Sequence, residues 1–322
     1  MKKTLVALAV LGSFASVASA ATSVTLYGRV DVGYDSLHHD GLKLSQDLDG
    51  VGNNMSRLGL KGEEDLGNGL AATFKLEGRF SADTGKYTKD MFDRESTVGL
   101  KGNFGAVRFG RALAAMDNGI GGFTVGERVA AVDNYSSSAR HSNSMFYDYS
   151  NSGFTVGGNV STKGGAGNDN EGAAGNDNEG AADSKVGYGL YAKYDANNFG
   201  LGAAYQRDGD GGKEWGVGAS YTFAPVTVGA SYADHRDADK YKTRIVNAYV
   251  SGDVTANDTV YAQYNRVKAG DEKAQNKYAL GYMHSLSKRT SVYAETAYTK
   301  RADSNQNLVN GWDYSVAMRH QF

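Results

Sequence analysis

The feature that most constrains this chain is a strict alternation of apolar and polar residues, repeated in segments of about ten residues. The last segment ends on Phe322, with Trp312, Tyr314, Val316 and Met318 on one face and Asp313, Ser315, Ala317 and Arg319 on the other. Successive side chains of a strand point to opposite faces, so each such segment is predicted to be a strand with an apolar and a polar face. The same length lets a tilted strand cross the hydrocarbon core of a bilayer.

The connections between these segments also alternate, between short turns and long polar loops. Short turns are expected near 67–69, 103–105, 151–153, 197–198, 224–225, 256–258 and 287–289, and long loops near 37–54, 82–90, 112–139, 162–185, 207–213, 235–241, 268–275 and 301–311. These fifteen connections predict sixteen strands, with all the long loops on one rim, as in outer-membrane barrels. Because lipid cannot satisfy backbone hydrogen bonds, the first and last strands must pair. The predicted fold class is therefore all-β, a 16-stranded antiparallel transmembrane β-barrel.

The N-terminus has the composition of a secretory signal peptide. Lys2 and Lys3 precede an apolar run from Leu5 to Val17, and Ala18-Ser19-Ala20 follows as a cleavage site. We therefore expect residues 1–20 to be removed and residues 21–322 to form the barrel. The run is shorter than the ~20 residues of a membrane-spanning helix, and no later apolar run reaches that length, which excludes a helical membrane protein.

Composition supports an exported all-β protein. The chain has 43 Gly, 21 Tyr, one Pro and no Cys, so no disulfide is expected. Without Lys2 and Lys3 it carries 32 basic and 36 acidic residues, a formal net charge of −4, and the basic residues do not cluster. We therefore expect no nucleic-acid partner.

Several motifs resemble those of a known family. The stretches SVTLYGRVDVGY, SRLGLKGEEDLGNGLAATFKLE and STVGLKGNFGAVRFGR, together with the terminal Phe322, resemble the general porins of Gram-negative outer membranes, especially the betaproteobacterial branch. The likeness covers nearly the whole mature chain. It implies a homotrimer of sixteen-stranded barrels, each with a pore narrowed by an inward-folded third loop, through which small hydrophilic solutes and ions diffuse passively. It also implies outer-membrane lipid and lipopolysaccharide as surroundings, and recognition of the last strand by the barrel-assembly machinery.

The third long loop, Ala112 to Ala139, is the predicted constriction. It is too long for a simple connection, and it contains a run of glycines and several acids. The family's familiar Pro-Glu-Phe-Gly-Gly run is replaced here by GIGGFTVGE. We therefore expect Glu127, and after it Asp117, to be the acid that faces the opposite wall.

Five arginines are the predicted wall of the constriction. Arg57, Arg94, Arg111 and Arg140 fall at positions that match the family's motifs, and Arg108 points inward on the alternation alone. Parity places Arg57 and Arg140 in the lumen. Arg94 and Arg111 instead share parity with lipid-facing residues, so either a bulge resets the phase of their strands or they lie beyond the apolar band. Because the arginines outnumber the loop acids, we expect a mild preference for anions.

Three other functions are considered. An enzyme is not expected, since the chain has no Gly-x-Ser-x-Gly motif and its His residues do not recur at metal-ligand spacing, so we expect no metal and no cofactor. A substrate-specific outer-membrane channel is the main alternative, although Tyr27, Tyr191 and Tyr261 do not obviously line up as an aromatic slide. A purely structural barrel or adhesin is the third.

Overall fold

The computed structural model describes residues 22–39, 42–47, 56–87, 90–162, 185–302 and 308–322. Residues 1–20, expected to form the signal peptide, lie outside this part of the chain. Among the described residues, no helix is long and apolar enough to cross a membrane. The strands, each antiparallel to its neighbours, are β1 (Ser23–His39), β2 (Leu42–Asp47), β3 (Arg57–Gly67), β4 (Leu70–Arg79), β5 (Glu95–Gly102), β6 (Gly105–Leu113), β7 (Arg140–Asn151), β8 (Phe154–Ser161), β9 (Tyr188–Ala196), β10 (Phe199–Arg207), β11 (Lys213–Phe223), β12 (Val226–Arg236), β13 (Lys242–Asp253), β14 (Asp258–Ala269), β15 (Gln275–Ser285), β16 (Thr290–Ala302) and β17 (Leu308–Gln321).

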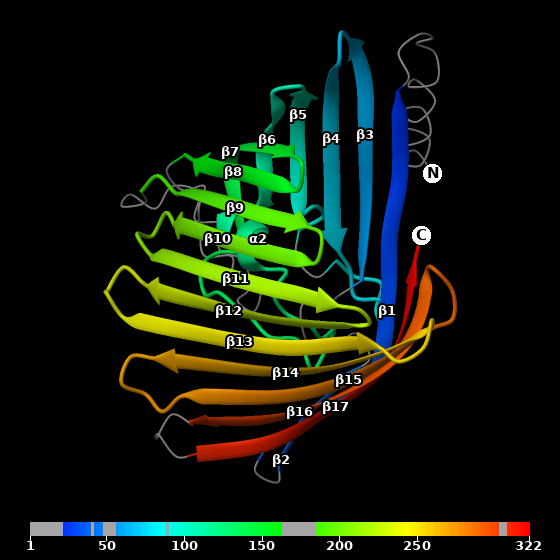
Figure 1. The fold of residues 1–322 in the computed structure, drawn as a ribbon, viewed down its shortest axis with the longest axis vertical. Helices are drawn as coiled ribbons and strands as arrows, with labels where there is room; N and C mark the ends of the chain where they lie inside the picture. The colour runs from blue at the N-terminus through cyan, green and yellow to red at the C-terminus, as the bar shows by residue number, and fades with distance from the viewer. Residues whose placement is uncertain (1–21, 40–41, 48–55, 88–89, 163–184, 303–307) are drawn as a thin grey trace.

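Sixteen of these strands form a closed barrel, as the sequence predicts. β3 to β17 pair in chain order, and β17 returns to β1 in a register that runs from Arg29 opposite Gln321 to His39 opposite Gly311. The backbone N–H groups of Gly28 and Phe322 each donate to the other's carbonyl at 3.1 Å, which completes the seam. In Figure 1, β3 to β5 cross the direction of β11 to β15 steeply, as opposite walls of a barrel with tilted strands do.

One predicted loop is partly strand. The first long connection was expected at 37–54, but β1 continues to His39 and the short β2 pairs back onto it, with Asp35 opposite Asp47. The seven short turns lie between consecutive strands at the positions that the sequence predicts. At Asn68-Gly69, for example, both residues have positive φ, 55° and 75°, which a tight hairpin between twisted strands requires.

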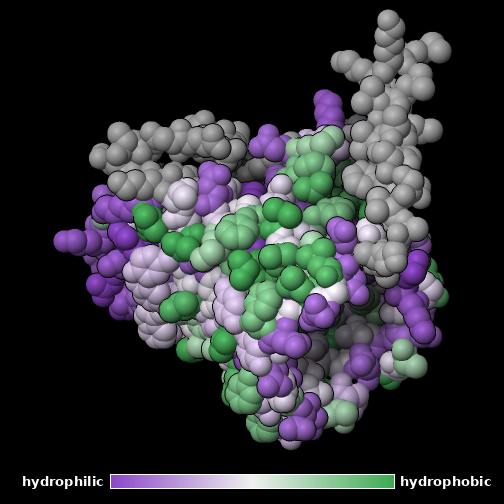
Figure 2. Space-filling view, turned by 90° about the horizontal axis from the view of Figure 1, so that it is seen from above, coloured by the Kyte–Doolittle hydropathy of each residue, from purple (hydrophilic) through white to green (hydrophobic). Residues whose placement is uncertain are grey.

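The two faces of the wall divide as the alternation predicts. On β17, Val316 is 64% exposed, whereas Asp313, Ser315 and Arg319 are buried. Figure 2, which looks down on the barrel from above the view of Figure 1, shows hydrophobic side chains over much of the wall on that upper side, with hydrophilic ones gathered at the left edge. The outward face is therefore apolar and the inward face polar, which suits a barrel in lipid with a polar interior.

Candidate pore constriction

The connection between β6 and β7 packs against the polar face of the wall. Its short helix α2 (Ala115–Ile120) buries Met116 and Ile120 among Tyr191, Ala204 and Ile245, and Figure 1 shows α2 beside β9 to β11. Small wall residues make this approach possible, because a Cβ on Gly202 would overlap the carbonyl oxygen of Gly119. Gly202 and Ala204 have the parity opposite to the exposed Leu201 and Tyr205, so the connection lies on the side away from the apolar band.

Glu295 on β16 holds the middle of this connection. Its carboxylate accepts backbone hydrogen bonds from Glu127 at 2.6 Å, Arg128 at 2.8 Å and Ala130 at 2.9 Å. The hydroxyl of Tyr261 donates to the same carboxylate at 2.5 Å. Several amides that converge on one buried carboxylate compensate its charge without a cation.

Other inward side chains bond to the same connection along its length. They come from β10, from Asp208 directly after it, and from β11, β13 and β14, and they satisfy backbone groups that a loop otherwise exposes. The bonds are Met116 N–H to Gln206 Oε1 (3.0 Å), Val125 N–H to Gln263 Oε1 (2.8 Å), Asn247 Nδ2 to Phe123 O (2.6 Å), Ser137 N–H to Glu214 Oε2 (2.5 Å) and Ser138 N–H to Asp208 Oδ2 (2.9 Å).

Glu127 and Arg128 join a charged cluster at the seam between β1 and β17. Arg128 bonds to Asp31 at 3.0 Å and to Asp35 at 2.6 Å, and Glu127 accepts two bonds from Arg319, at 2.6 and 3.0 Å. Arg319 also bonds to Asp31 at 2.8 Å. Burial alone would lower the pKa of Arg128, but the adjacent carboxylates raise it above its ordinary value, so this arginine stays charged.

Next to this cluster, arginines line up across the wall. Arg29 on β1 is directly opposite Arg57 on β3, which is directly opposite Arg79 on β4. Arg94 and Arg140 extend this group of arginines. Burial lowers the pKa of Arg94, and the positive charge of Arg140 nearby lowers it further. Like charges directly opposite one another destabilise a sheet, so this arrangement is expected only where it serves a function.

The predicted arginines differ in their partners. Arg57 is half-buried and makes no hydrogen bond or ion pair with the residues described. Arg94 lies just before β5 and bonds to Glu77 at 2.6 Å, so it is on the inner side. Arg108 bonds to Asp148 at 2.5 Å and stacks on Phe146, and Arg140 is buried at the start of β7.

Arg111 is brought to the inner side by a bulge. The register between β6 and β7 shifts between Gly110 and Ala112, and Gly110 has φ of 127°, a conformation that favours glycine. Arg111 then donates to the carbonyl of Asp93 at 2.6 Å and to Ser142 at 2.7 Å. Of the two readings that the sequence left open for this residue, the bulge is the one observed.

The two predicted acids lie in different places. Glu127 is at the seam, within electrostatic reach of Arg29. Asp117 is on α2 and accepts a hydrogen bond from Tyr135 at 2.5 Å, against β9 to β11. Four further arginines, Arg29, Arg79, Arg128 and Arg319, were not among the predicted site residues. The alternation placed Arg29, Arg79 and Arg319 on the polar face, so parity could have found them.

The three inward tyrosines do not form a continuous path. Tyr27, Tyr191 and Tyr261 lie on β1, β9 and β14, and their hydroxyls donate to Glu77, Asp148 and Glu295 respectively. A polar cavity of about 500 Å³ lies near the arginines, lined by Lys61, Lys75, Glu95, Arg108 and, from the connection, Asn118. In the part of the chain described, no group of three His, Cys, Asp or Glu could hold a metal ion.

A barrel of sixteen strands with an apolar outside and a charged inside is a channel protein of the bacterial outer membrane. Residues 7–304 match the family model described as Gram-negative porin. The chain is 35% identical to outer membrane porin protein 32 of Delftia acidovorans, over 95% of this chain and 91% of that one. It is 30% identical to an outer membrane porin protein of Bordetella pertussis over the full length of both. Among solved structures, the anion-selective porin from Comamonas acidovorans covers 94% of this chain and all of its own, with a TM-score of 0.75 and 28% identity.

The chain belongs to the Gram-negative porin family. It is a porin channel that crosses the outer membrane of a Gram-negative bacterium with many strands.

Proposed function

We propose that this porin is a general diffusion channel for small hydrophilic solutes and ions, narrowed where residues 112–139 fold into the barrel and face the wall arginines. The observation that carries this proposal is the docking of that connection onto inward side chains of β9 to β16. A sixteen-stranded barrel leaves an aqueous lumen, so a segment fixed inside it determines the narrowest point. The wall of the constriction is Arg57, Arg94, Arg108, Arg111 and Arg140, with Glu127 and Asp117 on the loop.

We further propose that the pore prefers anions. Glu127, Asp31 and Asp35 are bonded to Arg128 and Arg319, so these carboxylates are already compensated. Arg57, by contrast, has no bonded carboxylate among the described residues, and it stands between Arg29 and Arg79. An anion that enters this region meets positive charge at the wall. The relative from Comamonas acidovorans, described as anion-selective, supports the same direction.

Planar-bilayer recording tests both parts of the proposal. A large ohmic conductance step supports a general pore, and block of the current by a particular solute favours the substrate-specific alternative. Under a tenfold KCl gradient we expect a reversal potential on the anion-selective side, moved towards cations by Arg57→Glu. Arg289→Glu, an exposed change at the turn end of β16, is the matched control and should leave the reversal potential in place. A cation-selective reversal potential of the unaltered channel contradicts the proposed preference.

The assembled form is proposed to be a homotrimer, as the sequence resemblance implies, inserted by the barrel-assembly machinery through the strand that ends at Phe322. Electrophoresis without heating, beside a chemically cross-linked sample, tests the trimer. Because the relatives are porins, no catalytic role is proposed. Hydrolysis of lipid or peptide by the purified channel would reopen that question.

A further inference from the structure

Tyr27 on β1 reaches across β3 to contact Glu77 on β4. In the strand register Tyr27 is opposite Gly59, and Gly59 is opposite Glu77. The ring lies over Gly59, because a Cβ there would be 2.4 Å from Cζ and 2.5 Å from the hydroxyl oxygen of Tyr27. The hydroxyl donates to Oε2 of Glu77 at 2.9 Å. A side chain at residue 59 would block this path, so the glycine is a condition of the hydrogen bond.

Both carboxylate oxygens of Glu77 are occupied. Oε2 accepts from Tyr27, and Oε1 accepts from Nε of Arg94 at 2.6 Å. Arg57 is opposite Arg79, two residues along β4 from Glu77, so Arg57 and Glu77 are diagonal neighbours on one face. Long side chains bridge such a diagonal, and the charge of Arg57 does act on this carboxylate. Arg57 nevertheless makes no bond to Glu77, whose two oxygens are held by the other two residues.

The other acids on this part of the wall are bonded to cations of their own. Two of these pairs are Asp93 with Arg79 at 2.7 Å and Glu95 with Lys75 at 2.6 Å. Asp148 resembles Glu77, because one of its oxygens bonds to Arg108 at 2.5 Å and the other accepts from the hydroxyl of Tyr191. At Glu77, however, a second arginine, Arg57, lies beside the carboxylate and has no bonded acid among the described residues. A tyrosine hydroxyl therefore stands between a carboxylate and a cation that could pair.

We propose that Tyr27 is a positioning residue for ion selectivity, because its hydroxyl holds the Glu77 carboxylate away from Arg57 and leaves the charge of this arginine available to anions in the pore. A phenolic hydroxyl is neutral, so it occupies the oxygen without adding charge to the lumen. The attraction between two charges falls with their separation, so a carboxylate on the diagonal compensates Arg57 less than one in direct contact. The inference rests on the proposed preference for anions and names a residue that sets its strength.

The experiment compares reversal potentials in planar bilayers under a tenfold KCl gradient. Tyr27→Phe removes the hydroxyl but keeps the ring, and with it the contact with Lys61, whose Nζ lies 5.4 Å from the ring centroid. Oε2 of Glu77 is then released to bond to Arg57, and we expect the anion-to-cation permeability ratio to fall by about threefold. Tyr27→Phe/Glu77→Gln should restore at least the ratio of the parent, because a neutral carboxamide compensates neither Arg57 nor Arg94.

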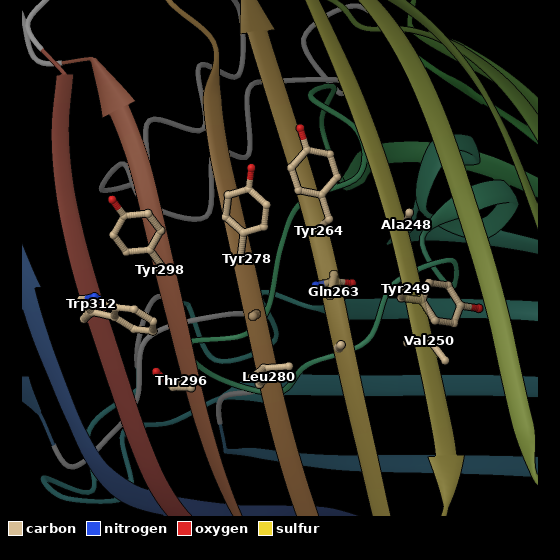
Figure 3. Close-up of a pocket in the computed structure, with 12 residues that line it drawn as sticks. Ala248, Tyr249, Val250, Gln263, Tyr264, Tyr278, Leu280, Thr296, Tyr298 and Trp312 are labelled. Carbon is tan, nitrogen blue, oxygen red and sulfur yellow. The ribbon is translucent and has the colours of Figure 1, made fainter.

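A second variant breaks the same hydrogen bond by another route. Gly59→Ala displaces the ring of Tyr27 and keeps its hydroxyl, so the permeability ratio should again fall. Tyr249→Phe is the matched control, since Tyr249 on β13 lies over Gly229 on β12 in the same way, and Figure 3 shows its ring extending from β13 towards the neighbouring strand. Its hydroxyl is hydrogen-bonded to the neutral Ser220, so its loss releases no carboxylate and the ratio should match that of the parent.

The outcomes separate this role from a merely structural one. An unchanged permeability ratio in Tyr27→Phe overturns the proposal, as does a fall in the ratio that Glu77→Gln does not reverse, because such a loss would come from a distorted wall. A fall that Glu77→Gln reverses supports it. The parent channel is recorded beside each variant. A parent that prefers cations contradicts the proposed preference for anions, whereas the shift between the parent and Tyr27→Phe still tests the role of Tyr27.

Discussion

Replacing Glu295 with alanine should release the loop that narrows the pore. The change removes the acceptor of three backbone N–H groups, from Glu127, Arg128 and Ala130, and of the Tyr261 hydroxyl. A buried donor left without a partner costs about 1–3 kcal/mol, so the three amides amount to roughly 3 kcal/mol or more. Each 1.4 kcal/mol is about a factor of ten in an equilibrium constant, so the undocked population should rise by about a hundredfold.

The assay is single-channel recording together with hydrogen exchange. For Glu295→Ala we expect a larger mean conductance, more current noise and faster exchange of the amides of residues 125–131, while the strands exchange as before. Glu63→Ala is the control, because Glu63 pairs with Lys101 in a half-exposed ion pair that contributes little. Unchanged conductance and unchanged exchange in Glu295→Ala would refute the reasoning that this carboxylate fixes the loop.

Two further predictions concern the seam of the barrel. In Gly28→Ala, the new Cβ would lie 2.5 Å from the carbonyl oxygen of Arg57 and 2.8 Å from Cζ of Phe322. We therefore expect the free energy of unfolding to fall by about 2 kcal/mol, and the heat-resistant band of folded protein on gels to become weaker. Gly122→Ala is the control, because a Cβ at Gly122 meets open space, and it should behave as the parent does. Arg128→Ala leaves Asp31 and Asp35 buried without this cation, which should cost about 3–5 kcal/mol in urea unfolding. Lys101→Ala should cost less than about 1 kcal/mol, and an equal loss in the two variants would count against a structural role for the buried cluster.

The barrel could be predicted from the sequence because alternation is a local property. On β17 the outward and inward sets follow residue by residue, and the short turns fall at the predicted positions, for example at Asn68-Gly69 and Asn197-Asn198. The same rule failed at Arg111, since one bulged residue inverts the parity of all that follows and only the register reveals it. The extension of β1 to His39 was likewise missed, because its polar composition resembles that of a loop.

The constriction was predicted less completely, for a physical reason. Parity shows that Glu295, Gln263 and Glu214 point inward, but the residues they meet belong to a loop more than 70 positions away. Which loop amide finds which carboxylate depends on the path of the whole connection. Glu127 was singled out for its charge, yet its bonded partner, Arg319, became evident only once β17 closed against β1.

The most direct test of the account is thiol modification of Arg57→Cys in open channels, because the chain contains no cysteine of its own. Val98→Cys, at a position 61% exposed on the lipid-facing side of β5, serves as the comparison. If Arg57 lines the narrowest part of an aqueous pore, a bulky water-soluble thiol reagent will reduce the current through Arg57→Cys by more than half and leave Val98→Cys unaffected. Equal currents before and after modification of Arg57→Cys, with the reagent shown to be attached, would contradict the account.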